Sequence, residues 1–285
     1  MVHDIRSEIV ATKAHDERSV TSKMTLHHKK EPNKVEPTSI KIHSDQADYY
    51  RYRTPYIAGL FEAVCKELGI TKTSTLMDLG CGRGEVASYL SNYAKKVYAI
   101  DGSKEMIDLS IKKEAIEYQV VDLNAENPVI KNKVDHLFFG RSIHWFPSES
   151  LHRLSSKLLD EEGCIVVCST QWSPVGDWGR VYFETRHKFI PPRQKQRHDF
   201  TGFVSLNGAG FVPTRKLAVD QVFRVDVDFM TGHTFSTTYR ENLKKLKSLS
   251  TEFGDEMKRS LQRYEEKNEM AIKVTSWAQI YKRSS

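Results

Sequence analysis

The residues best suited to chemistry are acids and glycines that follow short apolar segments. Residues 75–90 read TLMDLGCGRGEVASYL, with Asp78 just ahead of a turn that contains Gly80, Gly82 and Gly84. Asp101 and Asp122 close two later apolar segments. A glycine turn between a strand and a helix lets backbone N–H groups approach a nucleotide. The candidate ligands of this turn are therefore a dinucleotide, a phosphate or another adenosine-bearing cofactor.

The turn fits a dinucleotide only in part. Residues 82–87, GRGEVA, match G-x-G-x-x-A, and Asp101 follows at a suitable spacing. The Asp78 carboxylate, however, would repel a pyrophosphate arriving at the helix N-terminus. No Gly-Lys-Ser/Thr follows, which excludes a P-loop. Three acids around the turn better suit a ligand with an amino group, a ribose diol and an adenine, and S-adenosylmethionine has these parts and a positive sulfonium.

Strands alternate with helices on both sides of this turn. Helix spacing over residues 55–70 predicts a buried stripe of Ile57, Leu60, Phe61, Val64, Cys65 and Leu68. Strands are predicted at 75–79, 95–101, 116–123, 134–140 and 163–170, and helices at 85–94, 103–113 and 149–159. Ser103 is the expected N-cap of the second of these helices. This alternation implies a parallel sheet with right-handed crossovers.

The pattern changes after Thr170. Residues 171–200 are rich in Trp, Arg and Pro and suit an inserted helix or lid. We then expect a helix at 200–211, a strand at 216–227, a long charged helix at 239–270 and a last strand at 275–283. Residues 1–40 show little apolar periodicity and are predicted to be a mobile extension. The domain prediction is thus one domain at 41–285, with a core at 55–170, a lid at 171–200 and a C-terminal part at 201–285.

The composition is that of a soluble protein. The 285 residues are 39% hydrophobic and 28% charged, with a net charge of +6 and no apolar run long enough to span a membrane. The first twenty residues lack the apolar region of a secretory signal. The four cysteines form no C-x-x-C pair, so we expect reduced thiols, no metal and a cytoplasmic location. The basic run at 180–198 is either a solvated face or a surface for an anionic partner.

Three segments carry a family resemblance. DLGCGRG (78–84), YAIDGSKEMI (98–107) and VVDLNAE (120–126) resemble the successive cofactor motifs of class I S-adenosylmethionine-dependent methyltransferases. ADYYRYRTPY (47–56) and FFGRSIHWF (138–146) resemble the trans-aconitate methyltransferase type, a small-molecule branch. The resemblance covers about residues 45–170. It implies a Rossmann-like α/β fold: seven strands, mostly parallel with one antiparallel, and helices on both faces, with the inserted helical lid and the N-terminal arm added.

The resemblance also implies roles for single residues. S-adenosylmethionine, which leaves as S-adenosylhomocysteine, would be bound by Tyr49, Arg53, Asp78, Gly80, Gly82, Gly84, Asp101, Gly102, Met106, Asp122, Leu123 and Gly140. Within this set the glycine turn would lie under the methionine part, Asp101 would accept the ribose hydroxyls and Asp122 the adenine amine. Tyr50 matches the same family position as Tyr49 equally well.

The acceptor side is predicted from residue types alone. His144 is the expected base, and Tyr50, Trp145, Trp172, Trp178 and Arg180 are expected to line the substrate pocket. The predicted reaction is direct in-line methyl transfer to oxygen or nitrogen of a small molecule, anionic or aromatic. The alternatives are a nucleic-acid or protein methyltransferase that uses the 180–198 segment, an NAD-dependent oxidoreductase and a non-catalytic cofactor-binding protein. The sequence permits a monomer or a homodimer.

Overall fold

The fold is a seven-stranded sheet with helices on both faces. The computed structural model describes residues 47–192 and 206–284, so the predicted extension at 1–40 and the part of the predicted lid at 193–200 lie outside it. The strand order is β3-β2-β1-β4-β5-β7-β6, and β7 runs antiparallel to both of its neighbours. The strands are β1 Thr75–Leu79, β2 Lys96–Asp101, β3 Ile116–Val120, β4 Val134–Gly140, β5 Leu159–Val175, β6 Phe211–Arg224 and β7 Ala271–Arg283. The predicted mostly parallel sheet is confirmed.

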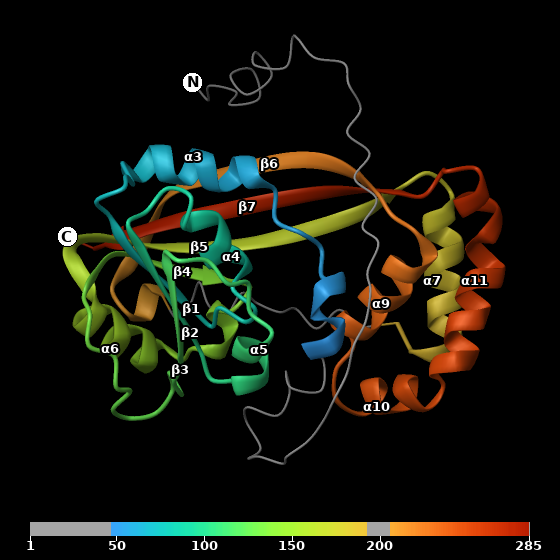
Figure 1. Cartoon of the computed structure of the whole chain (residues 1–285), viewed down its shortest axis with the longest axis horizontal. Helices are drawn as coiled ribbons and strands as arrows, with labels where there is room; N and C mark the ends of the chain where they lie inside the picture. Colours follow the sequence, from blue (N-terminus) through green and yellow to red (C-terminus); the bar gives the residue numbers. More distant parts are fainter. Residues whose placement is uncertain (1–46, 193–205, 285) are drawn as a thin grey trace, which may run out of the picture. The chain divides into compact units, whose positions relative to one another are not determined.

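Two apolar layers enclose the parallel half of the sheet. One face is covered by α3 (Ala58–Leu68), α4 (Glu85–Leu90) and α5 (Lys104–Asp108), whose apolar side chains join one core cluster. The other face is covered by α6 (Ser148–Leu158), which buries Leu151, Leu154 and Leu158. Figure 1 shows α3 and α6 on opposite sides of the strands. The strands between these layers carry their apolar residues on both faces, as expected of a buried parallel sheet.

The last strands are longer than predicted and extend beyond the parallel half. β5 continues to Val175, five residues past its predicted end, and β7 begins at Ala271 rather than at 275. Pairing from Thr170–Ser276 to Val175–Ala271 is continuous. Outward-facing polar residues interrupt the apolar run in the outer part of β5. For this reason the sequence predicts the end of the strand too early.

A second group of helices packs at the far end of these strands (Figure 1). It consists of α7 (Trp178–Phe189), α9 (Val227–Thr237), α10 (Arg240–Ser248) and α11 (Ser250–Glu266), which share a separate apolar core. The prediction of one helix over 239–270 is wrong, because the chain turns at Leu249 between α10 and α11. The prediction of a strand to residue 227 is also wrong at its end. The Asp226 side chain accepts the Phe229 N–H at 2.6 Å and caps α9 instead.

Two further features of the described residues concern the cysteines and the length of the helices. All four cysteines are buried and free of disulfides. Among the helices of the described ranges, none combines the length and the apolar character that a membrane crossing needs.

A short 3-10 helix, η1 (Ala47–Tyr52), joins the two halves by packing on α9. The Tyr49 ring stacks on Phe235 with centroids 4.7 Å apart, and the Arg53 guanidinium donates to the Tyr239 hydroxyl at 2.6 Å. The ring of Tyr52 lies over Gly232, where an added Cβ atom would come within 2.3 Å of it. Gly232 therefore sets how closely η1 approaches α9.

Replacing Gly232 tests this packing. We expect Gly232→Ala to destabilise the protein by about 1–3 kcal/mol, because the new methyl group overlaps the Tyr52 ring and must push η1 outward. Gly254→Ala is the matched control, since a Cβ at this position in α11 meets nothing within 4 Å. The control should be neutral or stabilising by up to about 1 kcal/mol. Urea unfolding of both variants measures the difference, and equal stabilities would contradict the packing.

Candidate functional site

The glycine turn folds back against the end of β2. Gly80, Gly82 and Gly84 have φ values of 68°, 55° and 80°, a left-handed conformation that side chains disfavour. The backbone N–H groups of Gly80 and Cys81 both donate to the Ile100 carbonyl, at 2.8 and 3.0 Å. The turn therefore depends on glycine for its shape and on β2 for its position.

Asp101 holds the turn from the carboxyl end of β2. Its Oδ2 accepts the Gly82 N–H at 2.7 Å and its Oδ1 accepts the Ser103 N–H at 2.8 Å. Burial raises the pKa of this carboxyl, and the backbone donors oppose the rise. Each carboxylate oxygen has a second lone pair, so the group retains the capacity to accept two ligand hydroxyls. Ser103 also accepts from Met106 N–H and caps α5, as predicted.

Asp78 lies beneath the turn and has no solvent exposure. Its Oδ2 accepts the Ala87 N–H in α4 at 3.1 Å, and within the described residues its buried Oδ1 has no hydrogen-bond partner. Burial raises the pKa of this carboxyl from 3.8 to about 7, and the nearby carboxylates of Asp101 and Glu85 add to the rise. A buried carboxylate oxygen without a partner, such as Oδ1 of Asp78, can accept a hydrogen bond from a ligand or carry a proton.

The residues of η1 divide between the turn and the helices. Tyr50 faces the turn, with its ring 3.6–3.7 Å from the position of a Cβ at Gly82. Tyr49 instead stacks on Phe235 of α9. A 3-10 helix turns by a third of a circle per residue, so neighbours point in different directions. Of the two tyrosines that match the family position, Tyr50 is the one beside the turn, while Arg53 lies over the Tyr50 ring at 5.2 Å.

Arg141 connects the surrounding elements. It has a positive φ of 57° and forms an ion pair with Glu85 of α4. The guanidinium also donates to the Thr54 carbonyl at 2.8 Å and lies 4.7 Å from the centre of the Tyr56 ring. The side chain thus ties the segment after η1 to the helix that follows the glycine turn.

The remaining predicted cofactor residues lie along the same strand ends. Gly102 and Gly140 are half-buried, Met106 and Leu123 are buried, and Asp122 is exposed. The Asp122 side chain accepts Asn124 N–H at 3.0 Å, and the Asn124 amide donates to the Trp145 carbonyl. The loops after β3 and β4 are therefore joined near the predicted adenine side.

The predicted acceptor residues do not form one group. His144 and Trp145 belong to η2 (Ile143–Trp145) after β4 and are exposed. Trp172 lies on the outer part of β5 and contacts Tyr182 and Phe183 of α7. Trp178 and Arg180, both predicted to line the substrate pocket, are placed differently in the structure. Trp178 has no exposed surface, and its indole N–H donates to the Val175 and Ala271 carbonyls. The exposed Arg180 pairs with Glu184 on its own helix.

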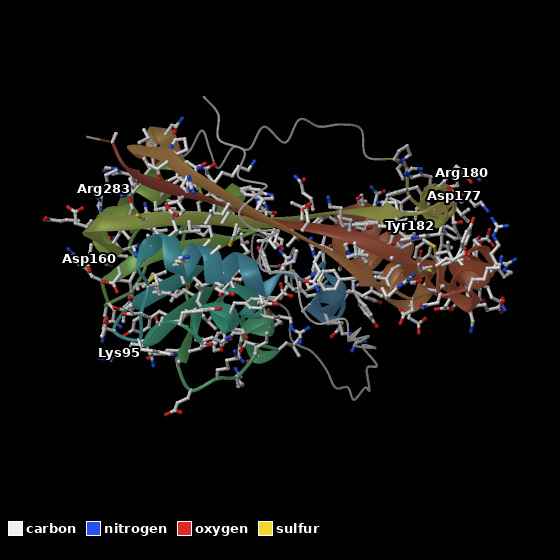
Figure 2. The ribbon with its side chains drawn as sticks, turned by 90° about the horizontal axis from the view of Figure 1, so that it is seen from above. Lys95, Asp160, Asp177, Arg180, Tyr182 and Arg283 are labelled. Atoms are coloured by element: carbon white, nitrogen blue, oxygen red, sulfur yellow. The ribbon has the colours of Figure 1, made fainter. Side chains whose placement is uncertain are left out.

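A cavity of about 480 Å³ lies beside Trp172 and α7. It is lined by Trp172, Tyr182, Phe183, Arg186, His187, Pro192, His233 and Thr237. The α7 residues of this lining recur at helical spacing, and Trp178 and Arg180 lie one turn earlier in α7, outside the lining. Figure 2 labels Tyr182 and Arg180 at the same end of the molecule, far from Lys95 and Asp160. His233 was not singled out from the sequence, because a histidine in a polar segment gives no signal of burial.

The comparisons with known proteins agree with this geometry. Residues 77–167 match a family model described as a methyltransferase domain. An uncharacterized methyltransferase of Schizosaccharomyces pombe is 23% identical over 70% of this chain and 82% of its own length. An uncharacterized methyltransferase-like protein of the same yeast is 27% identical over 60% of this chain and 64% of its own length, slightly less than two thirds.

One solved structure supports the fold. A putative type II methyltransferase from Anaeromyxobacter dehalogenans superposes with a TM-score of 0.59 at 15% identity, over 81% of this chain and 97% of its own. Residues 77–167 thus match a methyltransferase domain, and together with the sheet and the glycine turn they support an S-adenosylmethionine-dependent methyltransferase of class I.

The buried Asp78 predicts an unusual pH dependence of stability. Below pH 3.8 its carboxyl is protonated in both the folded and the unfolded chain, and between 3.8 and about 7 only the folded chain keeps the proton. The contribution of Asp78 to stability should therefore fall as the pH rises through this window, by up to about 4 kcal/mol. Asp78→Asn removes the charge at every pH and should remove this slope. Urea unfolding between pH 3.8 and about 7 measures how the free energy of unfolding depends on pH. Asp108→Asn, on the exposed face of α5, is the control. An unchanged pH slope in Asp78→Asn would contradict the prediction.

Proposed function

We propose that the protein transfers the methyl group of S-adenosylmethionine to oxygen or nitrogen of a small molecule by direct in-line displacement. The observation that carries the proposal is the Asp101 carboxylate, fixed by two backbone N–H groups at the edge of a left-handed glycine turn. A carboxylate with a free lone pair on each oxygen suits a vicinal diol, because it can accept both hydroxyls.

The surrounding residues fit the rest of such a cofactor. Tyr50 and Arg53 stand over the turn, Asp78 offers an oxygen without a partner among the described residues, and the loops at Asp122 and Gly140 continue along the strand ends. When bound, the cofactor supplies a methyl group made electrophilic by the adjacent sulfonium. The protein must then hold the acceptor in line, exclude water and accept or release any proton; no covalent enzyme intermediate is needed.

The acceptor side of the proposal follows from position. His144 and Trp145 stand at the carboxyl end of β4, where ligands of open α/β sheets bind. His144 remains the proposed base for an acceptor that must lose a proton. The resemblance of residues 47–56 and 138–146 to the trans-aconitate methyltransferase type favours a metabolite over a nucleic acid or a protein. Four buried free thiols suit a reducing compartment, and we propose the cytoplasm.

Calorimetric titration of the full chain tests the cofactor assignment. S-adenosylmethionine and S-adenosylhomocysteine should bind, and NAD should give no comparable heat. Asp101→Asn should weaken S-adenosylhomocysteine binding roughly 10- to 100-fold, because an amide cannot accept at both of its atoms. Asp108→Asn, on an exposed carboxyl paired with Lys104, should leave binding unchanged.

Two results would end the proposal. One is tight binding of NAD with no binding of S-adenosylhomocysteine by folded protein. The other is an Asp101→Asn variant that binds S-adenosylhomocysteine as well as the unmodified chain does.

A further inference from the structure

The 480 Å³ cavity has the walls of a site for an aromatic molecule. Trp172 and Phe183 present nearly parallel rings, 14° apart in plane and 5.9 Å between centroids. Tyr182 meets Trp172 edge-on at 6.0 Å. Aromatic walls of this kind bind planar apolar molecules through face and edge contacts.

One side chain of the lining, Arg186, is a permanent cation. Arg186 and His187 contribute nitrogen groups, and none of the described lining residues is Asp or Glu. The cavity therefore favours a molecule that is neutral or negatively charged, and it disfavours a cation.

His233 lines this cavity, and the hydrogen-bonding roles of its two ring nitrogens are defined. Its Nδ1 lies 2.9 Å from the Tyr52 carbonyl oxygen, which can only accept, so Nδ1 carries the proton. The other ring nitrogen, Nε2, is then an acceptor. Burial, helped by the positive charges of Arg53, Arg141 and Arg186, lowers the pKa of His233 to about 4, while its hydrogen bond to Tyr52 opposes the shift. The imidazole thus stays neutral at physiological pH, and Nε2 keeps its lone pair.

The short helix η1 contacts both the cavity and the glycine turn. Tyr52 holds His233 at the cavity, while Tyr50, two residues earlier in η1, lies against Gly82 of the glycine turn. A 3-10 helix rises about 2 Å per residue, so Tyr50 and Tyr52 are roughly 4 Å apart along its axis. One short helix therefore connects a wall of the cavity with the place proposed for the cofactor.

From these observations we infer that the cavity holds the ring of the acceptor, and that this acceptor is a hydroxylated aromatic molecule whose O–H donates to His233 Nε2. This inference rests on the proposed function and names its substrate class. An aromatic ring can pack against Trp172 and Phe183 on the cavity side, and a negative group on the ring is favoured by Arg186. His233 acts here as a specificity residue, because a neutral lone pair accepts a hydroxyl and rejects an oxygen anion at the same point.

The test compares two probes that differ by one hydroxyl. Binding of para-hydroxybenzoate and of benzoate is measured on the full chain saturated with S-adenosylhomocysteine. The hydroxylated probe should bind about tenfold more tightly, since only it satisfies Nε2. His233→Asn keeps an amide donor near the Nδ1 position for the Tyr52 carbonyl and lacks the Nε2 acceptor. This variant should bind both probes equally, with its affinity for S-adenosylhomocysteine unchanged.

Three control variants distinguish the specificity role of His233 from a general effect on folding and from an effect of His144. His152→Asn, at an exposed position of α6, should keep the preference for the hydroxyl. Phe183→Ser, at a residue 39% exposed, should weaken both probes and keep the preference. Equal binding of the two probes by the unmodified chain, or loss of the preference in His144→Asn but not in His233→Asn, would overturn the inference. Failure of S-adenosylhomocysteine itself to bind would instead refute the proposed function.

Discussion

The hydrogen bond from the Gly82 N–H to the Asp101 carboxylate is the constraint on which the site depends. It joins the turn after β1 to the end of β2, and the second carboxylate oxygen is held by Ser103. A carboxylate fixed at both oxygens cannot rotate, so its remaining lone pairs keep their directions. Preorganised acceptors of this kind bind without a cost of reorganisation. The same hydrogen bond explains the need for glycine, because a left-handed backbone brings the Gly82 N–H to Asp101 and glycine adopts this conformation most easily.

A half-buried arginine extends this constraint to the segment after η1. Arg141 pairs with Glu85 at the start of α4 and donates to the Thr54 carbonyl just after η1. Removing either partner would leave a half-buried charge without its ion-pair partner, which is more costly than losing an exposed ion pair. The segment after η1 is therefore held in place by electrostatics on its inner side, while Tyr49 and Tyr52 hold η1 to α9 by packing on its outer side.

The sequence predicts the parallel half well, because its signals are local. The stripe of α3, the glycine turn and the Ser103 cap each depend on residues close together in the chain. The outer half depends on distant contacts. α9 buries Gly232, Thr234 and Ser236 as well as apolar residues, so it shows no apolar stripe, and outer β5 alternates with exposed polar residues. The choices between Tyr49 and Tyr50, and between Trp172 and Trp178, depend on which face of a helix or strand meets a neighbour, and residue type alone does not contain that information.

The long strands connect the glycine turn with the cavity beside Trp172 through continuous backbone pairing. β5 leaves the parallel half beside Gly140 and continues, without interruption of its pairing with β7, to the strand residues that carry Trp172. A paired strand is stiffer than a loop, so the position of Trp172 relative to the strand ends is set by backbone hydrogen bonds. η1 supplies the second connection, through Tyr50 at the turn and Tyr52 at His233. Methyl transfer requires three atoms nearly in line, and much of its rate comes from that alignment. Two independent rigid connections between the glycine turn and the cavity are what such an alignment needs.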